Sequence, residues 1–226
     1  MISIAVPTGL LLDGSLELLR RAGAADLDQE EIGRKLLVEK NGLRVVLVKP
    51  ADVPAYVDHG SADLGFAGKD QLWESPGGHY ELLDLGFGAC RLIVAVPEAS
   101  PLNGPEAWPP TLRVGTKYAR ATMEFMARLG QPVEIVRLYG SVELAPQVGL
   151  VDAIVDVTQT GRTLRENRLR VVAEVDRSTA RLIANQASLK TRTQPLQQLV
   201  TRIREAVALT TAPATLPLKM GGEAGD

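Results

Sequence analysis

Short apolar runs recur along this chain, and segments with helical spacing stand between them. An apolar run rich in β-branched residues and bounded by turn residues predicts a strand buried on both faces. Strands that alternate with helices predict an α/β architecture in which mostly parallel sheets are flanked by helices. The predicted strands span residues 2–6, 43–49, 62–67, 90–97, 112–115, 133–138, 153–157 and 169–175, and the predicted helices span 15–22, 53–60, 119–129 and 195–209.

A proline-rich stretch interrupts this alternation near the middle of the chain. Residues 99–111 have the sequence ASPLNGPEAWPPT and directly follow the apolar run at 90–97. Clustered prolines are typical of surface connections. Because 226 residues are enough for two interleaved units, we expect two lobes with a cleft between them.

Charge and residue usage argue against several classes of protein. A formal net charge of −2 disfavours a general nucleic-acid surface, which needs a basic face. No apolar run reaches the roughly 18 residues of a membrane span, and Asp13 and Glu17 interrupt the first apolar segment, so we expect neither an anchor nor a signal peptide. The single cysteine, Cys90, excludes an intramolecular disulfide, and with His59 and His79 it makes no zinc spacing. We expect a cytoplasmic protein.

The most informative segment is residues 152–167, DAIVDVTQTGRTLREN. A predicted buried strand is followed by a turn rich in threonine and glycine and then by the start of a helix. Backbone N–H groups at such a helix start are unpaired and carry partial positive charge. Threonine hydroxyls add donors, and Gly161 permits close approach to the backbone. The pattern therefore predicts a site for a phosphate monoester.

Asp156 stands at the carboxyl end of the predicted strand 153–157, where open α/β sheets bind ligands. Its carboxylate is placed to accept hydrogen bonds from vicinal ribose hydroxyls. The alternative is that Thr160 or Thr163 is only an N-cap and Gly161 only a turn residue. The segment lacks the GxxxxGK[ST] and GxGxxG patterns of nucleoside-triphosphatase and dinucleotide loops.

This segment resembles the phosphoribosyl-pyrophosphate loop of ATP phosphoribosyltransferases, the first enzymes of histidine synthesis. Other segments resemble the same family in the same order, and together they cover most of residues 1–206. They are DVPAYVDHGSADLGFAGKD (52–70), ELLDLGFGACRL (81–92), LYGSVELAPQVGLVDAIVD (138–156) and RLIANQASLK (181–190). Because the chain ends soon after the predicted helix at 195–209, the resemblance implies the short form of the enzyme, which lacks a regulatory domain.

The resemblance also implies a fold and a partner. Family members have two lobes like periplasmic binding proteins, with the active site in the cleft between lobes. In this chain lobe I would comprise residues 1–91 and 179–209, lobe II residues 92–178, and a flexible tail residues 210–226. Short-form subunits act in a hetero-oligomer with a regulatory subunit that resembles histidyl-tRNA synthetase. Neither a nucleic-acid nor a membrane partner is expected.

The reaction implied is substitution at the anomeric carbon of ribose. N1 of the adenine of ATP attacks C1 of phosphoribosyl pyrophosphate, and pyrophosphate leaves. Because little proton transfer is needed, catalysis would depend on orientation and charge stabilisation. Both substrates are polyanions, so Mg²⁺ is the expected cofactor, carried by the substrates without direct ligation by the protein.

Individual residues match positions to which the family assigns roles. The turn would hold the 5′-phosphate through Thr158, Gln159, Thr160, Gly161, Arg162 and Thr163, and Asp156 would hold the ribose hydroxyls. Glu143 and Asp70 would face the reaction centre, and Arg34 would approach the pyrophosphate or the ATP phosphates. Further candidates for contacts with ATP or pyrophosphate are Lys69, Arg91, Lys117 and Gly9.

Each of these side chains also has a structural alternative. Lys69, Arg91 and Lys117 are equally suited to salt bridges at the surface or between lobes. Asp70 and Glu143 stand where capping residues stand, and Arg34 is also suited to a position as an exposed helix-end charge. Cys90 is flanked by apolar residues and is expected to be a small buried hydrophobe, and His59 and His79, beside glycines, are expected at the surface.

One departure from the family pattern concerns the first loop. Family members usually have a PKGR-like string there, whereas this chain has Pro7-Thr8-Gly9-Leu10. Three explanations stay open: another arginine such as Arg20 or Arg21 substitutes, the regulatory subunit completes the site, or activity is lost or changed. The alternatives to an active transferase are therefore an impaired or substrate-shifted paralogue and an anionic-ligand-binding protein of the same fold.

Overall fold

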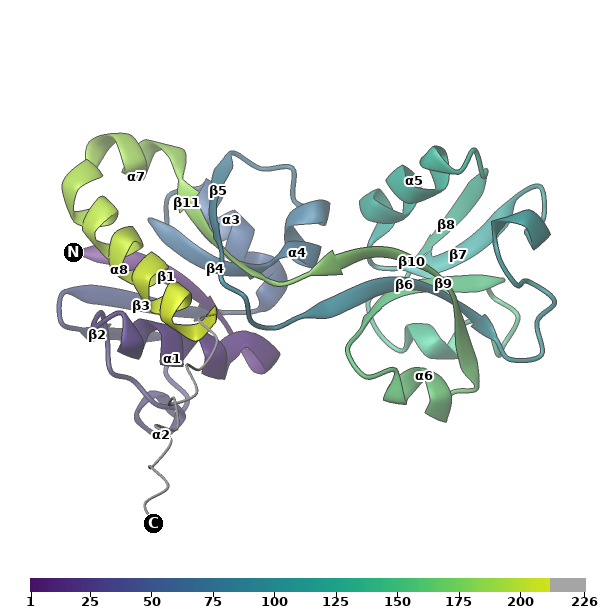
Figure 1. Cartoon of the computed structure of the whole chain (residues 1–226), viewed down its shortest axis with the longest axis horizontal. Coiled ribbons are helices and arrows are strands. Elements are labelled where there is room, and N and C mark those ends of the chain that lie inside the picture. The colour runs from purple at the N-terminus through teal and green to yellow at the C-terminus, as the bar shows by residue number, and fades with distance from the viewer. Residues whose placement is uncertain (212–226) are drawn as a thin grey trace, which may run out of the picture.

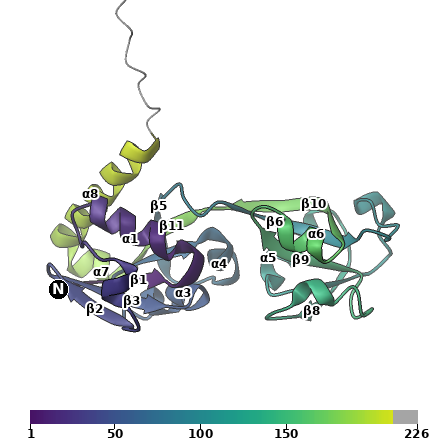
Figure 2. The same ribbon diagram turned by 90° about the horizontal axis from the view of Figure 1, so that it is seen from below.

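A computed structural model describes residues 1–211 of the chain as two α/β lobes that lie side by side (Figure 1). The first lobe is built around a six-stranded sheet and the second around a five-stranded sheet. Figure 2, seen from below, shows that β10 runs from one lobe to the other along one edge of the molecule. The chain crosses between the lobes twice, entering the second lobe with β6 and leaving it with β10.

The first lobe has the strand order β2-β3-β1-β4-β11-β5. Its strands are β1 (Ile2–Pro7), β2 (Leu37–Lys40), β3 (Leu43–Val48), β4 (Leu64–Gly68), β5 (His79–Asp84) and β11 (Ala180–Asn185). Its α-helices are α1 (Leu12–Arg21), α2 (Gln29–Ile32), α3 (Val53–Asp58), α4 (Lys69–Glu74), α7 (Gln186–Thr191) and α8 (Thr193–Thr211), and 3₁₀ turns lie at Gly9–Leu11 (η1) and Pro50–Asp52 (η2).

The second lobe has the strand order β10-β6-β9-β7-β8. Its strands are β6 (Cys90–Pro97), β7 (Leu112–Thr116), β8 (Val133–Arg137), β9 (Ala153–Thr158) and β10 (Leu169–Ser178). Its α-helices are α5 (Ala119–Arg128) and α6 (Arg162–Glu166), with 3₁₀ turns at Pro105–Ala107 (η3) and Val142–Leu144 (η4).

The two-lobed α/β class is confirmed, but the sheets are mixed and not mostly parallel. In the first sheet β1 lies parallel to β3 and β4, whereas β2, β11 and β5 join it in antiparallel pairings. In the second, β7 lies parallel to β8 and β9, and β6 is antiparallel to β9 and β10. β11 is antiparallel to β4 because it re-enters the first lobe after the second crossing, whereas β2 is antiparallel to β3 because the two strands form a hairpin.

The strands β2, β5 and β11 were not predicted: β11 is apolar but was not identified as a strand, and the edge strands β2 and β5 are not apolar runs. β2 (LVEK) and β5 (HYELLD) contain no buried residue and mix polar with apolar residues. β2 forms a hairpin with β3 through Asn41 and Gly42, whose φ angles are 53° and 76°. An Asn-Gly pair between two strands is the usual signature of a tight two-residue hairpin, so the sequence did carry a clue to β2.

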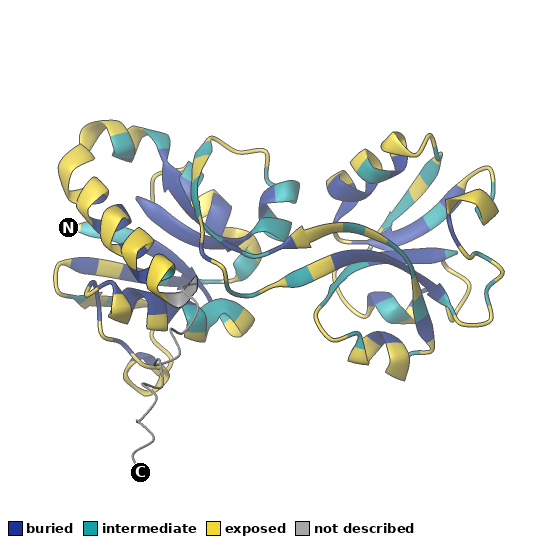
Figure 3. Cartoon of the chain, in the orientation of Figure 1, coloured by how far each residue is buried: buried dark blue, intermediate teal, exposed yellow. Residues whose placement is uncertain are grey.

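Each lobe has its own apolar core around its sheet, and buried residues gather in the strands (Figure 3). Helix α8 follows the second lobe in sequence but packs back on the first, where Leu196, Leu199 and Ile203 join Phe66 and Leu182. α8 extends to Thr211, into the predicted tail, and the rest of that tail lies outside the described residues. Across residues 1–211, no helix is long and apolar enough to cross a membrane.

Candidate functional site

A cavity of about 450 Å³ lies between the two lobes. The first lobe contributes residues from four separate segments, among them Leu10, Leu11, Pro50 and Asp70, and the second contributes the whole stretch 156–164. The remaining lining residues are Gly68, Gln71, Gly88, Cys90, Lys117, Tyr118 and Glu143. All six residues of the predicted phosphate turn therefore line one cavity together with Asp156, Glu143 and Asp70.

The turn between β9 and α6 has the geometry expected for an anion site. Gly161 adopts a φ of 70° and is the residue before the first turn of α6, a conformation that favours glycine. Two amides of the turn are satisfied by its own hydroxyls, since Gly161 N donates to Thr158 Oγ1 (3.0 Å) and Arg162 N to Thr160 Oγ1 (3.4 Å). The amides of Thr160 and Thr163 donate to no other residue within 1–211. The turn thus combines local capping with free donors.

The two arginines of α6, Arg162 and Arg165, make different contacts. The Arg162 Nε atom pairs with Glu166 at 2.7 Å along the exposed face of the helix. Arg165, which was not among the predicted site residues, donates from Nη1 to the carbonyl of Thr160 at 3.1 Å and so supports the turn from behind. A guanidinium that bonds a turn carbonyl stiffens the turn, and stiff donors are the more effective for binding.

Asp156 is half-buried in β9, two residues before the strand ends, and burial raises the pKa of its carboxyl. Lys117 opposes that shift, as does the Val157 N–H, which donates to Asp156 Oδ1 at 2.8 Å. The carboxylates of Glu143 and Asp70 add to the rise. The carboxylates of Glu143 and Asp70 therefore act electrostatically on that of Asp156 across the cavity.

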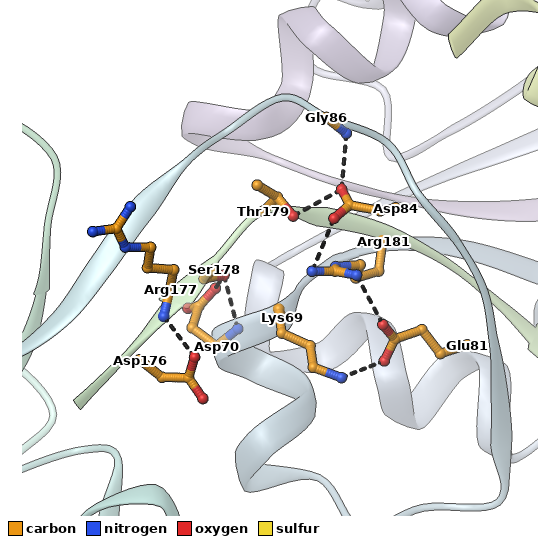
Figure 4. Close-up of polar contacts among 10 residues, drawn as sticks. All are labelled: Lys69, Asp70, Glu81, Asp84, Gly86, Asp176, Arg177, Ser178, Thr179 and Arg181. Atoms are coloured by element: carbon orange, nitrogen blue, oxygen red, sulfur yellow. Dashed lines mark hydrogen bonds and ion pairs between the residues drawn. The ribbon is translucent and has the colours of Figure 1, made fainter. Parts of the chain in front are cut away.

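Asp70 lies on α4, and its contacts extend beyond the first lobe. Its Oδ1 accepts from the Ser178 hydroxyl (2.9 Å) at the end of β10, as Figure 4 shows, and its Oδ2 accepts from the Tyr118 hydroxyl (3.1 Å) in the second lobe. The residue before the first turn of α4 is Gly68, so Asp70 is not the N-cap of its helix. Burial and the neighbouring carboxylates raise the pKa of Tyr118, which keeps it a neutral donor.

Glu143 lies in η4 after Ser141, whose φ of 48° is uncommon for a residue other than glycine. Its carboxylate has no hydrogen-bond partner in the part of the chain that the structure describes. Lys117 forms no ion pair among residues 1–211; its Nζ lies 4.9 Å from the centroid of the Tyr118 ring. Both side chains are thus free to meet a ligand.

Other predicted side chains lie elsewhere. Lys69 pairs with Glu81 at 2.5 Å (Figure 4), and Arg91 pairs with Glu174 at 3.3 Å, which confirms the salt-bridge alternative for both. Neither lines the cavity. Arg34 is exposed between α2 and β2, also outside the cavity lining, and its contact with phosphates stays a prediction.

Three further residues from the sequence analysis are Gly9, Cys90 and His79. Gly9 begins η1 with a φ of 79° and does not itself line the cavity, although Leu10 and Leu11 do. Cys90 is half-buried and faces the cavity, where burial raises the pKa of its thiol, so its expected place in an apolar interior is wrong. The His79 side chain is only 9% exposed, and its Nδ1 atom lies 2.8 Å from Asp58 Oδ1. The expected surface position of His79 is therefore wrong.

The described residues 1–211 contain no cluster of three or more His, Cys, Asp or Glu side chains that could hold a metal ion. The ionisable residues of the cavity lining are Asp70, Glu143, Asp156, Lys117 and Arg162, together with Cys90 and Tyr118, whose pKa values are raised.

Comparisons with known proteins identify the family to which the sequence is similar. The sequence profile of the family described as HisG, ATP phosphoribosyltransferase, matches residues 49–205. The chain is 46% identical over 209 residues to the ATP phosphoribosyltransferase of Caldanaerobacter subterraneus subsp. tengcongensis, covering 92% of this chain and 98% of the relative. It is 43% identical over 202 residues to that of Rubrobacter xylanophilus, covering 88% and 94%.

Solved structures show the same likeness. The ATP phosphoribosyl transferase (HisG:HisZ) complex from Thermotoga maritima contains a chain that is 30% identical, with a TM-score of 0.79 over 92% of this chain and all (100%) of that one. The periplasmic aliphatic sulphonate binding protein SsuA from Escherichia coli has a TM-score of 0.61 at 15% identity, covering 92% of this chain and 69% of SsuA. The second likeness shows only that the two-lobed architecture is shared.

Proposed function

Since the chain belongs to the ATP phosphoribosyltransferase family, we propose that the cavity between its lobes is the active site. The chain transfers the phosphoribosyl group of phosphoribosyl pyrophosphate to N1 of ATP, releases pyrophosphate and so catalyses the first step of histidine biosynthesis. The observation that supports the location is the convergence of the phosphate turn with Asp156, Glu143 and Asp70 on one cavity.

In this proposal the second lobe holds the sugar phosphate. The 5′-phosphate lies on the turn Thr158–Thr163, where free amides and the helix start of α6 supply donors. Asp156 accepts hydrogen bonds from the ribose hydroxyls and so orients C1 toward the first lobe. An anchored ribose leaves the reacting carbon as the only part of the donor that must move.

Charge explains why carboxylates surround the reaction centre. As the bond from C1 to pyrophosphate breaks and the bond from adenine N1 forms, positive charge develops on the ribose ring and negative charge on the leaving group. Asp156, Glu143 and Asp70 line the cavity around that position, where negative groups stabilise a cationic sugar. Lys117 and Arg162 line the same cavity and would help to neutralise the departing pyrophosphate, and Mg²⁺ carried by the substrates would supply further positive charge.

The proposal extends to a partner and a compartment. The structure from Thermotoga maritima is a complex of HisG with HisZ. We infer that this chain likewise acts in a hetero-oligomer, with a regulatory subunit that resembles histidyl-tRNA synthetase. We also propose a cytoplasmic location, because ATP and a reducing environment for Cys90 are found there.

The experiment that tests the site has two parts. The change in adenine absorbance follows turnover when the chain is mixed with ATP, phosphoribosyl pyrophosphate and Mg²⁺, with and without the regulatory subunit. Calorimetry with ribose 5-phosphate measures the second-lobe subsite by itself. Turnover together with ribose 5-phosphate binding that a change at Gly161 abolishes supports the proposal. Turnover that survives a loss of that binding contradicts the location of the phosphate.

A further inference from the structure

Helix α4 belongs to the first lobe by its place between β4 and β5, yet it packs against the second lobe. The Trp73 side chain joins the apolar cluster of the second lobe, which includes Leu92, Val114 and Tyr118. In Figure 1, α4 and α5 face each other across the space between the lobes. The two lobes are therefore joined by more than the two chain crossings.

Glu74, at the end of α4, caps the N-terminus of α5 in the second lobe. Its Oε2 accepts from the N–H of Arg120 (3.0 Å) and its Oε1 from the N–H of Ala121 (2.9 Å), both in the first turn of α5. The residue before α5, Tyr118, makes no capping hydrogen bond with its side chain. A negative carboxylate at a helix N-terminus satisfies orphan donors and complements the helix dipole. The cap of α5 is thus supplied from the other lobe.

Asp70 stands one helical turn before Glu74, so both carboxylates lie on the same face of α4. Asp70 lines the cavity and accepts hydrogen bonds from Tyr118 and Ser178. Glu74 does not line the cavity, and its carboxylate accepts hydrogen bonds from the first turn of α5. The two contacts act on the same short stretch, residues 118–121. An anchor at Glu74 therefore determines how Asp70 meets the second lobe.

We propose that Glu74 is a positioning residue of the transferase: by docking α4 on α5 it holds the two lobes at the angle in which Asp70 faces Asp156 and the phosphate turn. Without the cap, the lobes sample other angles, and the fraction of molecules with a complete site falls. The sugar-phosphate subsite lies wholly in the second lobe, so it is expected to remain intact. Only ligands that touch both lobes would bind or react less well.

The chain carries a native probe of this contact. Its two tryptophans are Trp73 and Trp108, so a Trp108→Phe background reports Trp73 alone. In that background Glu74→Ala is expected to make Trp73 more accessible to quenching by acrylamide in the ligand-free full chain. Glu74→Gln, which keeps one acceptor oxygen, is expected to restore much of the protection. Glu17→Ala is the matched control, since Glu17 is an exposed helix carboxylate that pairs with Arg20 inside one lobe (2.8 Å).

Kinetics then separate positioning from simple support of the fold; this arm rests on the proposed function. With the regulatory subunit present, Glu74→Ala is expected to lower kcat/KM for ATP about tenfold, with Glu74→Gln between it and the wild type. The Kd of ribose 5-phosphate should change by less than about twofold.

The quenching and binding results together test the proposed role of Glu74. Unchanged quenching of Trp73 in Glu74→Ala would overturn the proposal. A parallel loss of ribose 5-phosphate binding and turnover would also overturn it, because Glu74 would then support the second lobe and not the angle. If the wild type neither binds ribose 5-phosphate nor turns over, the proposed function fails, and the ligand-free quenching still decides whether Glu74 docks the lobes.

Discussion

The two lobes build their walls of the cavity in different ways. The second lobe contributes mainly one uninterrupted stretch, 156–164, whose position follows from a strand, a glycine turn and a helix start in succession. The first lobe contributes single residues or pairs from η1, η2, the end of β4 and the start of α4. One wall is a local motif, and the other exists only because distant segments pack together.

The walls also differ in chemistry. The second wall presents backbone amides, hydroxyls and Arg162, whereas the first presents Leu10, Leu11 and Pro50 around Asp70. Of the two neutral residues that replace the family's basic pair, Leu10 lines the cavity and Thr8 does not, and the first-lobe lining contains no lysine or arginine. Arg20, offered above as a substitute, pairs with Glu17 and is not among the lining residues. Phosphate recognition is thus expected to depend mostly on the second lobe.

The largest effect is expected from Gly161→Val, which breaks the local motif. A β-branched residue is strained at the φ of 70° found at Gly161, and shifting the turn misplaces the phosphate. We expect kcat/KM for phosphoribosyl pyrophosphate to fall about 100-fold or more, measured by the absorbance assay.

Gly130→Val is the control for this change. Gly130 has a φ of 66° with open space around its Cα, and it does not line the cavity. It should lose a similar amount of stability but bind ribose 5-phosphate normally. Equal loss of binding in both variants would show that strain, and not the turn, explains the effect.

Asp156→Asn is expected to have the next largest effect, because the amide keeps the shape but loses the charge. Hydrogen bonds to a charged acceptor contribute about 1.5–3 kcal/mol, so kcat/KM should fall about 10- to 100-fold. Since the pKa of Asp156 is raised, wild-type kcat/KM should decline as pH falls toward that pKa, and the Asn variant should show a flatter profile. Profiles of the same shape in both proteins would assign the titration to another group.

Stability provides an independent check on the same side chain. Between the ordinary and the raised pKa of Asp156, the folded state holds a proton that the unfolded state has lost, so this group lowers the free energy of unfolding as pH rises through that window. The Asn variant lacks this contribution. It should therefore be the more stable protein above the window, and the difference should vanish below it, as followed by urea unfolding at several pH values. A wild type that is the more stable at neutral pH would contradict this account.

A smaller gain is expected from Leu10→Arg, which restores a charge to the first wall. Leu10 is 73% exposed and lines the cavity, so an arginine there can reach a polyphosphate without burial. Exposed ion pairs contribute little, so we expect turnover to rise about two- to fivefold. Leu36→Arg, at a similarly exposed leucine outside the cavity (69%), should leave it unchanged. An equal response in the two variants would mean that general charge, and not position, matters.

The smallest effect is expected from Arg91→Ala. Arg91 is exposed, pairs with Glu174 and does not line the cavity. Glu174 keeps a second partner, Arg177 at 2.7 Å. Activity should stay within about twofold of the wild type and the free energy of unfolding within ~1 kcal/mol. A larger loss of activity would mean that the lobes move enough during the reaction to bring Arg91 to the substrate.

Much of the fold was predictable because apolar strands and amphipathic helices are local patterns. The strands β1, β3, β6, β7, β8 and β9 and the helices α1, α5 and α8 lie where periodicity places them. β2 and β5 were missed because edge strands are half-exposed and lack a continuous apolar run. The direction of the strands was also misjudged, since pairing depends on where the chain returns after crossing to the other lobe.

What the sequence by itself determined is the phosphate turn, because its strand, Gly161 and helix start are consecutive and need no distant partner to take their shape. What only the tertiary structure decided is which side chains meet that turn. Asp70, Tyr118 and Ser178 stand far apart in the chain and become hydrogen-bonded neighbours only when the lobes dock. Lys69 and Arg91, which look as suitable in sequence as Lys117, are engaged by Glu81 and Glu174. The physical reason is that backbone conformation follows from neighbouring residues, whereas the partner of a charged side chain is settled by packing across the whole fold.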